Sequence, residues 1–357
     1  MSNMENQETQ MRGLLEETLG IEASGAQVFR LKQDASLRSY FRILLPGGAA
    51  GEKEASWVVM AMPKEALKQS EEGGAQPASE ELPFLNVHRY LQGLGMPVPA
   101  IFRLDEARGM MLLEDLGDTT LEAHVKQHPK ALEASYAALT DMLAQLRARA
   151  EKAPSPECLG FKREFNHALY RWELEHFREW GLNIWSTVSR TAAEDAALSE
   201  CFEALAGSLA ALPRGFCHRD FQSRNLMLKQ GQWHMIDFQD ALLAPRAYDL
   251  VALLRDSYIE LEPDFIQKMI THYVACFSQY SGEDMDEEAF RHTFELLTVQ
   301  RKLKDAARFE YIARQKHNPT FLPFIPLSLR YVRTALSRLP ELSRLQGLLA
   351  RWLPELA

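Results

Sequence analysis

Long apolar runs are missing from this sequence: no stretch of 18 consecutive apolar residues occurs, so no membrane-spanning helix is expected. Cysteine is also scarce, and the four cysteines are widely separated, without a Cys-x-x-Cys pair. That spacing argues against a zinc site and is typical of free thiols in a reducing compartment. The first twenty residues are acidic and contain no apolar core, which argues against a signal peptide. We therefore expect a cytoplasmic protein with no membrane partner.

An excess of basic residues is missing as well. Lys and Arg number 40 against 49 Asp and Glu, so the net charge is −9, which argues against a nucleic-acid partner. The largest basic cluster, QRKLKDAAR at residues 300–308, has helical spacing, and we expect it to form a solvated helix face. The alternative is that one of its cations reaches an anionic ligand.

The residues that are present indicate two parts. A chain of 357 residues exceeds one ordinary domain, and a hydrophobic fraction of 46% allows a sizeable core. The first part combines helical spacing with strand-like segments, at residues 11–19 and 83–95 for helices and 27–31, 40–45, 56–62 and 96–117 for strands. The rest is mainly helical. This order predicts an α+β protein of two lobes, residues 1–113 and 114–357.

One stretch of the second part, FCHRDFQSRNLMLKQGQWHMIDFQDA at residues 216–241, carries the strongest chemical signal. It contains H-R-D-x-x-x-x-N followed by D-F, which is the phosphoryl-transfer signature of kinases. Asp220 would orient an attacking hydroxyl and take its proton. Asn225 and Asp237 supply the hard oxygen ligands that Mg²⁺ prefers, and a hairpin around residues 230–231 would bring them together. The alternative is that these residues only cap turns.

Three neighbours of the signature have less specific roles. His218 is expected to brace the loop by hydrogen bonding rather than to transfer a proton. Arg219 could contact a phosphate or hold the loop, and the sequence does not separate these roles. Asp249 stands at the start of an expected helix, where it could cap the helix and also tie down the catalytic loop.

The motifs resemble those of the aminoglycoside phosphotransferase-like superfamily, which shares the protein-kinase fold. Five motifs have sequences similar to those of the bacterial N-acetylmuramate/N-acetylglucosamine kinase family: RSYFRI, PFL, LLEDLGD, CHRDFQSRNLM and IDFQDALLAPRAYDLVALLRDSY. They are spread over residues 28–260. The resemblance implies a small antiparallel-sheet N-lobe and a larger, mainly helical C-lobe. It also implies ATP and Mg²⁺ as cofactors, and an amino sugar phosphorylated at its anomeric hydroxyl in a cell-wall recycling route.

The resemblance also implies where the nucleotide binds. LLEDLG would be the hinge between the lobes, with backbone groups of Glu114, Asp115 and Leu116 meeting adenine. The loop DASLRSY has no G-x-G-x-x-G pattern, but the backbone N–H groups around Ser36 and Ser39 could cradle phosphate.

One departure concerns the lysine that kinases place on the third strand to hold the phosphates. Here that strand reads WVVMAMPK, with methionines in its place. Lys64 could curl back, or Arg38 or Arg42 could serve, since an arginine fork binds polyphosphate well. The glutamate that would pair with this cation could be Glu80 or Glu81. A third alternative is that the function is lost and the protein is a pseudokinase.

The acceptor is expected near Asp220, and Arg219, Arg255 and Asp256 are the candidate substrate-binding residues. Arg301 or Lys304 of the basic cluster are further possibilities. Other acceptors of the superfamily remain open, namely an aminoglycoside, choline or homoserine. A polycationic aminoglycoside would call for an acidic pocket, which net charge alone does not decide.

Overall fold

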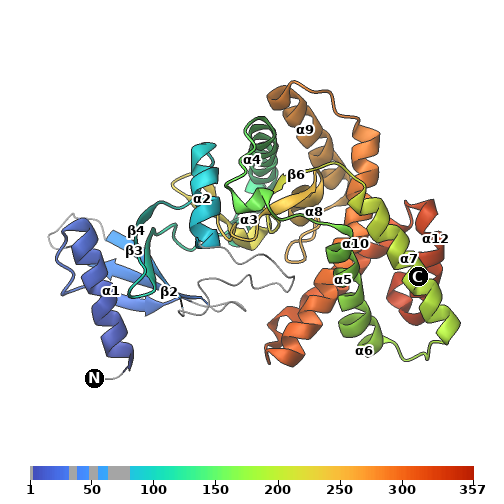
Figure 1. Cartoon of the computed structure of the whole chain (residues 1–357), viewed down its shortest axis with the longest axis horizontal. Helices are drawn as coiled ribbons and strands as arrows, with labels where there is room; N and C mark the ends of the chain where they lie inside the picture. The colour runs from blue at the N-terminus through green and yellow to red at the C-terminus, as the bar shows by residue number, and fades with distance from the viewer. Residues whose placement is uncertain (1–2, 32–37, 48–54, 63–80) are drawn as a thin grey trace.

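The computed structural model describes residues 3–31, 38–47, 55–62 and 81–357. Figure 1 shows an elongated molecule in which a small sheet lies at the N-terminal end and a large group of helices at the C-terminal end. This arrangement confirms the predicted α+β class with a small antiparallel sheet and a larger helical part. None of the helices in these ranges combines the length and the hydrophobicity that a membrane span requires.

The sheet has five strands in the order β1-β2-β3-β5-β4, and every neighbouring pair is antiparallel. Its strands match the predicted segments to within a few residues: β1 (Gln27–Arg30), β2 (Ser39–Leu45), β3 (Ala55–Ala61), β4 (Ile101–Asp105) and β5 (Met110–Glu114). Gly109 closes the turn between β4 and β5 with a positive φ of 66°. A side chain there would also meet the carbonyl oxygen of Met62 at 2.8 Å, so both conformation and space require glycine.

The two faces of the sheet are buried by different helices. Helix α1 (Asn3–Leu19) packs Met11, Leu14 and Leu15 against one face, where they join Ile43 and Val59 in a separate core. The next residue along β3, Met60, points to the opposite face and joins the main core of the molecule with α2 (Pro83–Gly93). This alternation follows from the two-residue period of a strand. The face opposite α1 therefore packs against the rest of the protein.

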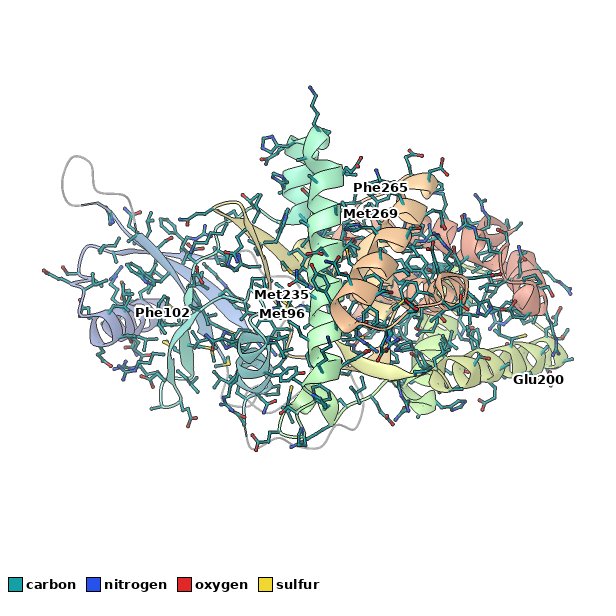
Figure 2. All side chains as sticks on the ribbon, turned by 90° about the horizontal axis from the view of Figure 1, so that it is seen from above. Met96, Phe102, Glu200, Met235, Phe265 and Met269 are labelled. Carbon is teal, nitrogen blue, oxygen red and sulfur yellow. The ribbon has the colours of Figure 1, made fainter. Side chains whose placement is uncertain are left out.

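The sheet meets the helical part through β5 and the segment that precedes β4. After β5 the chain runs into α3 (Leu121–Gln127), and the backbone N–H of Leu228 donates to the carbonyl of Thr119 at 2.8 Å. Met96 and Met235 lie side by side in Figure 2, where the N–H of Met235 donates to the carbonyl of Pro97 at 2.9 Å. We propose the end of β5 as the boundary between the two lobes, at residues 113 and 114.

The helical part surrounds two short strand pairs, β6 with β9 and β7 with β8. The strands are β6 (Arg214–Cys217), β7 (Leu226–Lys229), β8 (Gln232–Met235) and β9 (Leu242–Pro245). The helices are α4 (Leu132–Lys152), α5 (His167–Phe177), α6 (Asn183–Trp185), α7 (Ala192–Ala210), α8 (Tyr248–Leu254), α9 (Pro263–Ser281), α10 (Glu287–Gln315), α11 (Ile325–Leu336) and α12 (Ser343–Trp352). Single helical turns occur at residues 129–131, 159–161, 178–182, 223–225, 319–324, 340–342 and 354–356.

Helix α10 runs through the middle of the helical part and contacts α5, α8 and α11. The prediction that residues 300–308 form a solvated face is therefore wrong: Gln300, Arg301, Lys302 and Lys304 are all buried. The pattern misled because Gln300 and Arg301 find their partners, Glu173 and Asp220, in distant parts of the chain. Lys302 and Lys304 bind Asp305 of the same helix, and buried charges persist only when such partners exist.

Candidate active site

The catalytic loop begins where β6 ends, and Asp249 in the first turn of α8 holds it. One carboxylate oxygen of Asp249 accepts the backbone N–H of His218 at 2.7 Å, and the other accepts that of Arg219 at 2.8 Å. Arg219 has a positive φ of 80°, an unfavourable conformation for a residue with a side chain. Burial raises the pKa of Asp249 to about 6, while the two N–H donors oppose that rise. Asp249 therefore does tie down the loop.

His218 braces the same loop from inside. Burial lowers the pKa of its imidazole to about 4, although the nearby charge of Asp220 acts in the opposite direction. The ring is therefore neutral at pH 7, and its Nδ1 accepts the backbone N–H of Asp220 at 3.3 Å. This geometry confirms the structural role expected for His218.

The β7–β8 hairpin brings Asn225 and Asp237 together, as the spacing predicted. Its turn residues, Gln230 and Gly231, both have positive φ, of 51° and 80°. The amide nitrogen Nδ2 of Asn225 donates to the carbonyl of Asp220 at 2.9 Å and lies 3.5 Å from Oδ2 of Asp237. Two candidate metal ligands and the candidate base therefore occupy one site.

The Asp237 carboxyl opens onto the solvent of the cleft between sheet and helices. Enclosure by the cleft walls raises its pKa to about 6, and the carboxylates of Asp220 and Asp240 act in the same direction. A hydrogen bond of 2.7 Å from Nε2 of Gln239 and the positive charge of Arg38 oppose the rise. A divalent cation would neutralise this local excess of negative charge.

These residues fit Mg²⁺. With Nδ2 of Asn225 donating to Asp220, its amide oxygen is left as a ligand beside the Asp237 carboxylate, and both are hard oxygen donors. Across the described ranges no three His, Cys, Asp or Glu residues form a group that could hold a metal by themselves. Phosphate oxygens and water would have to supply the other ligands of the ion.

A cavity of about 440 Å³ lies between the sheet and the β7–β8 hairpin. Its apolar walls come from both lobes and include Tyr40, Val58, Leu113, Met227 and Ile236. Asn225 and Asp237 lie at its polar end, and residues 114–117 form its edge. An apolar slot beside two candidate metal ligands suits a nucleotide, with the base in the slot and the phosphates at Asp237.

The predicted hinge residues use their side chains for structure. Glu114 binds Nζ of Lys229 at 2.6 Å and accepts the N–H of Ala100 at 3.0 Å. Asp115 pairs with Arg42 and accepts the N–H of Gly117 at 2.8 Å. Because both carboxylates are engaged, it is the backbone of Glu114, Asp115 and Leu116 that we propose to meet the base.

Arg42, on β2, lines the cavity, whereas Arg38 precedes β2 and acts on Asp237. The Arg42 guanidinium is held by Asp118 and Asp115, at 2.8 and 2.6 Å, which raises its pKa and keeps it at the hinge end. Arg38 is 7% exposed, and its charge acts on Asp237 at the polar end. Ser39, on β2, lies near Arg30, whose Nη2 is 3.4 Å from its hydroxyl.

Three further candidates lie outside the described residues: Ser36 of the phosphate loop, Lys64 for the lysine function and Glu80 as the glutamate that would pair with it. Glu81 accepts hydrogen bonds from Arg89 and Asn86 at the start of α2, at 2.5 and 2.9 Å, and so belongs to that helix.

The three predicted acceptor residues need correction. Arg219 is 2% exposed, and its guanidinium lies 3.8 Å from Glu173 and over the ring of Phe165, so it holds the loop from the core side. Arg255 is buried against Glu295, 3.5 Å away.

Asp256 is equally enclosed: it accepts the backbone N–H groups of Ser223 and Tyr258, at 2.8 and 3.0 Å. The prediction failed because α8 ends at Leu254, after which the turn directs both side chains inward.

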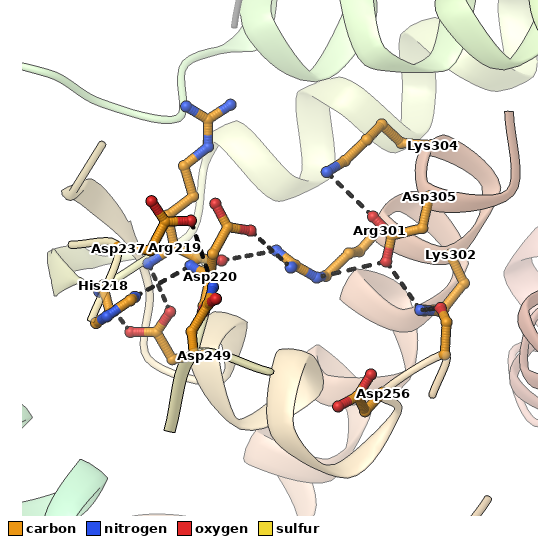
Figure 3. A network of polar contacts seen from close by, with 12 residues as sticks. His218, Arg219, Asp220, Asp237, Asp249, Asp256, Arg301, Lys302, Lys304 and Asp305 are labelled. Carbon is orange, nitrogen blue, oxygen red and sulfur yellow. Dashed lines mark hydrogen bonds and ion pairs between the residues drawn. The ribbon is translucent and has the colours of Figure 1, made fainter. Parts of the chain in front are cut away.

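The residue that reaches Asp220 instead is Arg301 of α10. Its guanidinium donates to the carbonyl of Arg219 at 2.8 Å and to Oδ1 of Asp220 at 3.1 Å. Figure 3 shows it between Asp220 and Asp305. From the sequence, Arg301 was only one further possibility for an acceptor-binding residue. A carboxylate four residues later, at Asp305, was the available sign that this cation is paired rather than solvated.

Comparison with known proteins shows the family of the chain. Residues 30–290 match the family model described as "Phosphotransferase enzyme family". The chain is 30% identical to the N-acetylmuramate/N-acetylglucosamine kinase of Pseudomonas aeruginosa, over 92% of this chain and 89% of that one. It is also 30% identical to the enzyme of the same name from Neisseria meningitidis, over 88% and 87%.

Solved structures agree on the fold. A choline kinase from Cryptosporidium parvum superimposes with a TM-score of 0.61 at 12% identity, over 96% of this chain and 97% of that one. A spectinomycin phosphotransferase in complex with ADP and spectinomycin gives 0.55 at 14% identity, over 91% and 93%. The family match and the two kinases at 30% identity show that this is an enzyme of the kinase class. The chain belongs to the phosphotransferase enzyme family, as its motifs predicted.

The pKa of Asp237 predicts how metal binding depends on pH. Because a protonated carboxyl does not bind Mg²⁺, the Mg²⁺ concentration needed for half-saturation should rise about tenfold for each pH unit below 6 and level off above 7. Calorimetric titration of the complex with an ATP analogue between pH 5 and 8 measures this. The same titration of Asp237→Asn measures the share of the pH dependence that comes from the phosphates of the analogue. Equal pH dependence in both proteins would contradict the assignment.

Proposed function

We propose that this phosphotransferase is a Mg²⁺- and ATP-dependent sugar kinase that phosphorylates the anomeric hydroxyl of N-acetylmuramate or N-acetylglucosamine. The two relatives at 30% identity carry that name, and the alignment with each extends over at least 87% of both chains. The spectinomycin phosphotransferase of similar fold was solved with ADP, which supports an adenine nucleotide here.

The observation that carries the choice of acceptor is the likeness to the two amino-sugar kinases over nearly the whole chain. The charges of α10 beside Asp220 do not choose between acceptors, because Arg301, Lys302 and Lys304 are buried and bound to Asp220, Asp305 and Ser257.

The chemistry follows from the placement of the side chains. Asp220 accepts a hydrogen bond from the anomeric hydroxyl, orients it, and takes its proton as the new oxygen–phosphorus bond forms. The bond between the γ-phosphorus and the bridging oxygen breaks, and ADP leaves. Asn225 and Asp237 would hold Mg²⁺, which, when bound, offsets the negative charge of the phosphates. The apolar slot holds the base and fixes the distance of the γ-phosphate from Asp220.

The alternative of a pseudokinase is less well supported. The amide nitrogen of Asn225 donates to the backbone carbonyl of Asp220 at 2.9 Å and lies 3.5 Å from the Asp237 carboxylate. Two buried residues, His218 and Asp249, hold the loop in place. A protein that only bound nucleotide would need the slot but not a braced catalytic carboxylate.

An acceptor panel tests the proposal. With ATP and Mg²⁺, we expect transfer to N-acetylmuramate and N-acetylglucosamine, and not to kanamycin, choline or homoserine. Loss of the ¹H signal of the free anomeric position, together with a ³¹P coupling to that proton, identifies the product. Asp220→Asn should lower kcat by at least about 100-fold at unchanged nucleotide affinity. Transfer to kanamycin would contradict the acceptor, and nucleotide binding without any transfer would favour the pseudokinase.

A pair of arginine variants tests which cation replaces the strand lysine. Arg38 acts on Asp237 at the phosphate end, whereas Arg42 is paired at the hinge. Arg38→Met should therefore lower kcat by about 100-fold, as loss of one preorganised cation does, and Arg38→Lys should recover part of it. Steady-state kinetics of Arg42→Met provide the comparison, with a smaller loss expected. A larger loss in the Arg42 variant would give it the role instead.

A further inference from the structure

Arg301 stands out among the buried cations because it touches the catalytic carboxylate itself. It comes from α10, 81 positions after Asp220, and is 2% exposed. One nitrogen, Nη1, donates to the carbonyl of Arg219, and the other, Nη2, donates to Oδ1 of Asp220. A planar guanidinium that binds backbone and carboxylate at once fixes the angle of that carboxylate as well as its position.

Arg301 is itself held from two sides. Its guanidinium lies 5.0 Å from the centre of the Tyr248 ring, and its Nε is 3.8 Å from Oδ2 of Asp305. Lys302 and Lys304 in turn bind Asp305, at 2.8 and 3.1 Å. Burial alone would raise the pKa of the Asp305 carboxyl, but these three cations hold it well below its usual range. Asp305 therefore stays ionised and keeps Arg301 from rotating toward another partner.

The contact leaves the two oxygens of Asp220 in different situations. Oδ1 is bound by Arg301, whereas a quarter of the Asp220 side chain remains exposed. The oxygen that can receive an acceptor proton is therefore Oδ2. Burying an arginine only to fill space is unfavourable, because its charge loses its hydration. Packing alone does not explain why this charge lies here.

We propose that Arg301 is a positioning residue for phosphoryl transfer: it fixes Asp220 through Oδ1 so that Oδ2 faces the acceptor hydroxyl, and Asp305 and Tyr248 keep it in place. The inference rests on the proposed role of Asp220 as the base. It adds an element of the site that lies outside the catalytic motif and on a different helix.

Arg255 provides a matched control for the test. It too is buried, at 3% exposure, lies 5.0 Å from a tyrosine ring, that of Tyr331, and pairs with a carboxylate, that of Glu295. Arg301→Ala should lower kcat by about 100-fold while the KM for ATP changes less than about threefold. Added guanidinium should restore part of the Arg301→Ala rate, and it should not restore Asp220→Asn. Arg255→Ala should keep kcat near the wild-type value at a similar loss of thermal stability.

Each result separates a positioning role from a structural one. A kcat for Arg301→Ala equal to that of Arg255→Ala overturns the proposal, and so does a loss that guanidinium does not restore. Should the alanine variant fail to fold, Arg301→Lys decides. Lysine keeps the charge but cannot bridge both acceptors. A kcat at least tenfold lower in a variant that melts at the same temperature as the wild type supports the role, and an unchanged kcat overturns it.

The wild-type rate in the same assay keeps this inference distinct from the proposed function. A wild-type protein that transfers phosphate, beside Arg301 variants that are unimpaired, overturns the positioning role alone. A wild-type protein that transfers none overturns the proposed function and the positioning role together.

Discussion

The two hydrogen bonds from the catalytic loop to Asp249 are the interaction on which the site depends. They hold His218 and Arg219 in a backbone path that includes a positive φ at Arg219, which a residue with a side chain adopts only when its surroundings enforce it. Asp220 follows at once in the chain, so its direction is set by that path. The carbonyl of Asp220 then accepts Nδ2 of Asn225 and thereby positions the candidate metal ligand.

Around this loop the helical half buries several charges beside their partners. Arg219 faces Glu173, Arg301 faces Asp220 and Asp305, and Asp256 accepts backbone N–H groups. Buried pairs of this kind add little net stability, but removing one partner is costly. They therefore act as constraints: each alternative arrangement of the loop would leave a charge without its partner. Burying these charges is unfavourable by itself, but it restricts the loop to a single geometry.

The sequence predicted those parts of the site whose information is local. Asp220, Asn225 and Asp237 lie within eighteen residues, and a two-residue turn joins the strands that bring them together. The sheet was equally accessible, because alternating apolar residues and turn glycines mark each strand. The role of Arg301 could not be predicted, because no local pattern around residue 301 indicates contact with a loop 81 positions earlier. Arg255 and Asp256 failed for a related reason: a helix end decides their direction, and its last residue was not predictable to the necessary precision.

The proposed function requires that Asp220 faces the anomeric hydroxyl of an amino sugar. A crystal structure of the complex with N-acetylmuramate, Mg²⁺ and a non-hydrolysable ATP analogue tests this most directly. We expect the anomeric oxygen about 3 Å from Oδ2 of Asp220 and in line with the γ-phosphate, while Arg301 still binds Oδ1. A different hydroxyl of the sugar at Asp220, or a sugar bound away from α10, would contradict it.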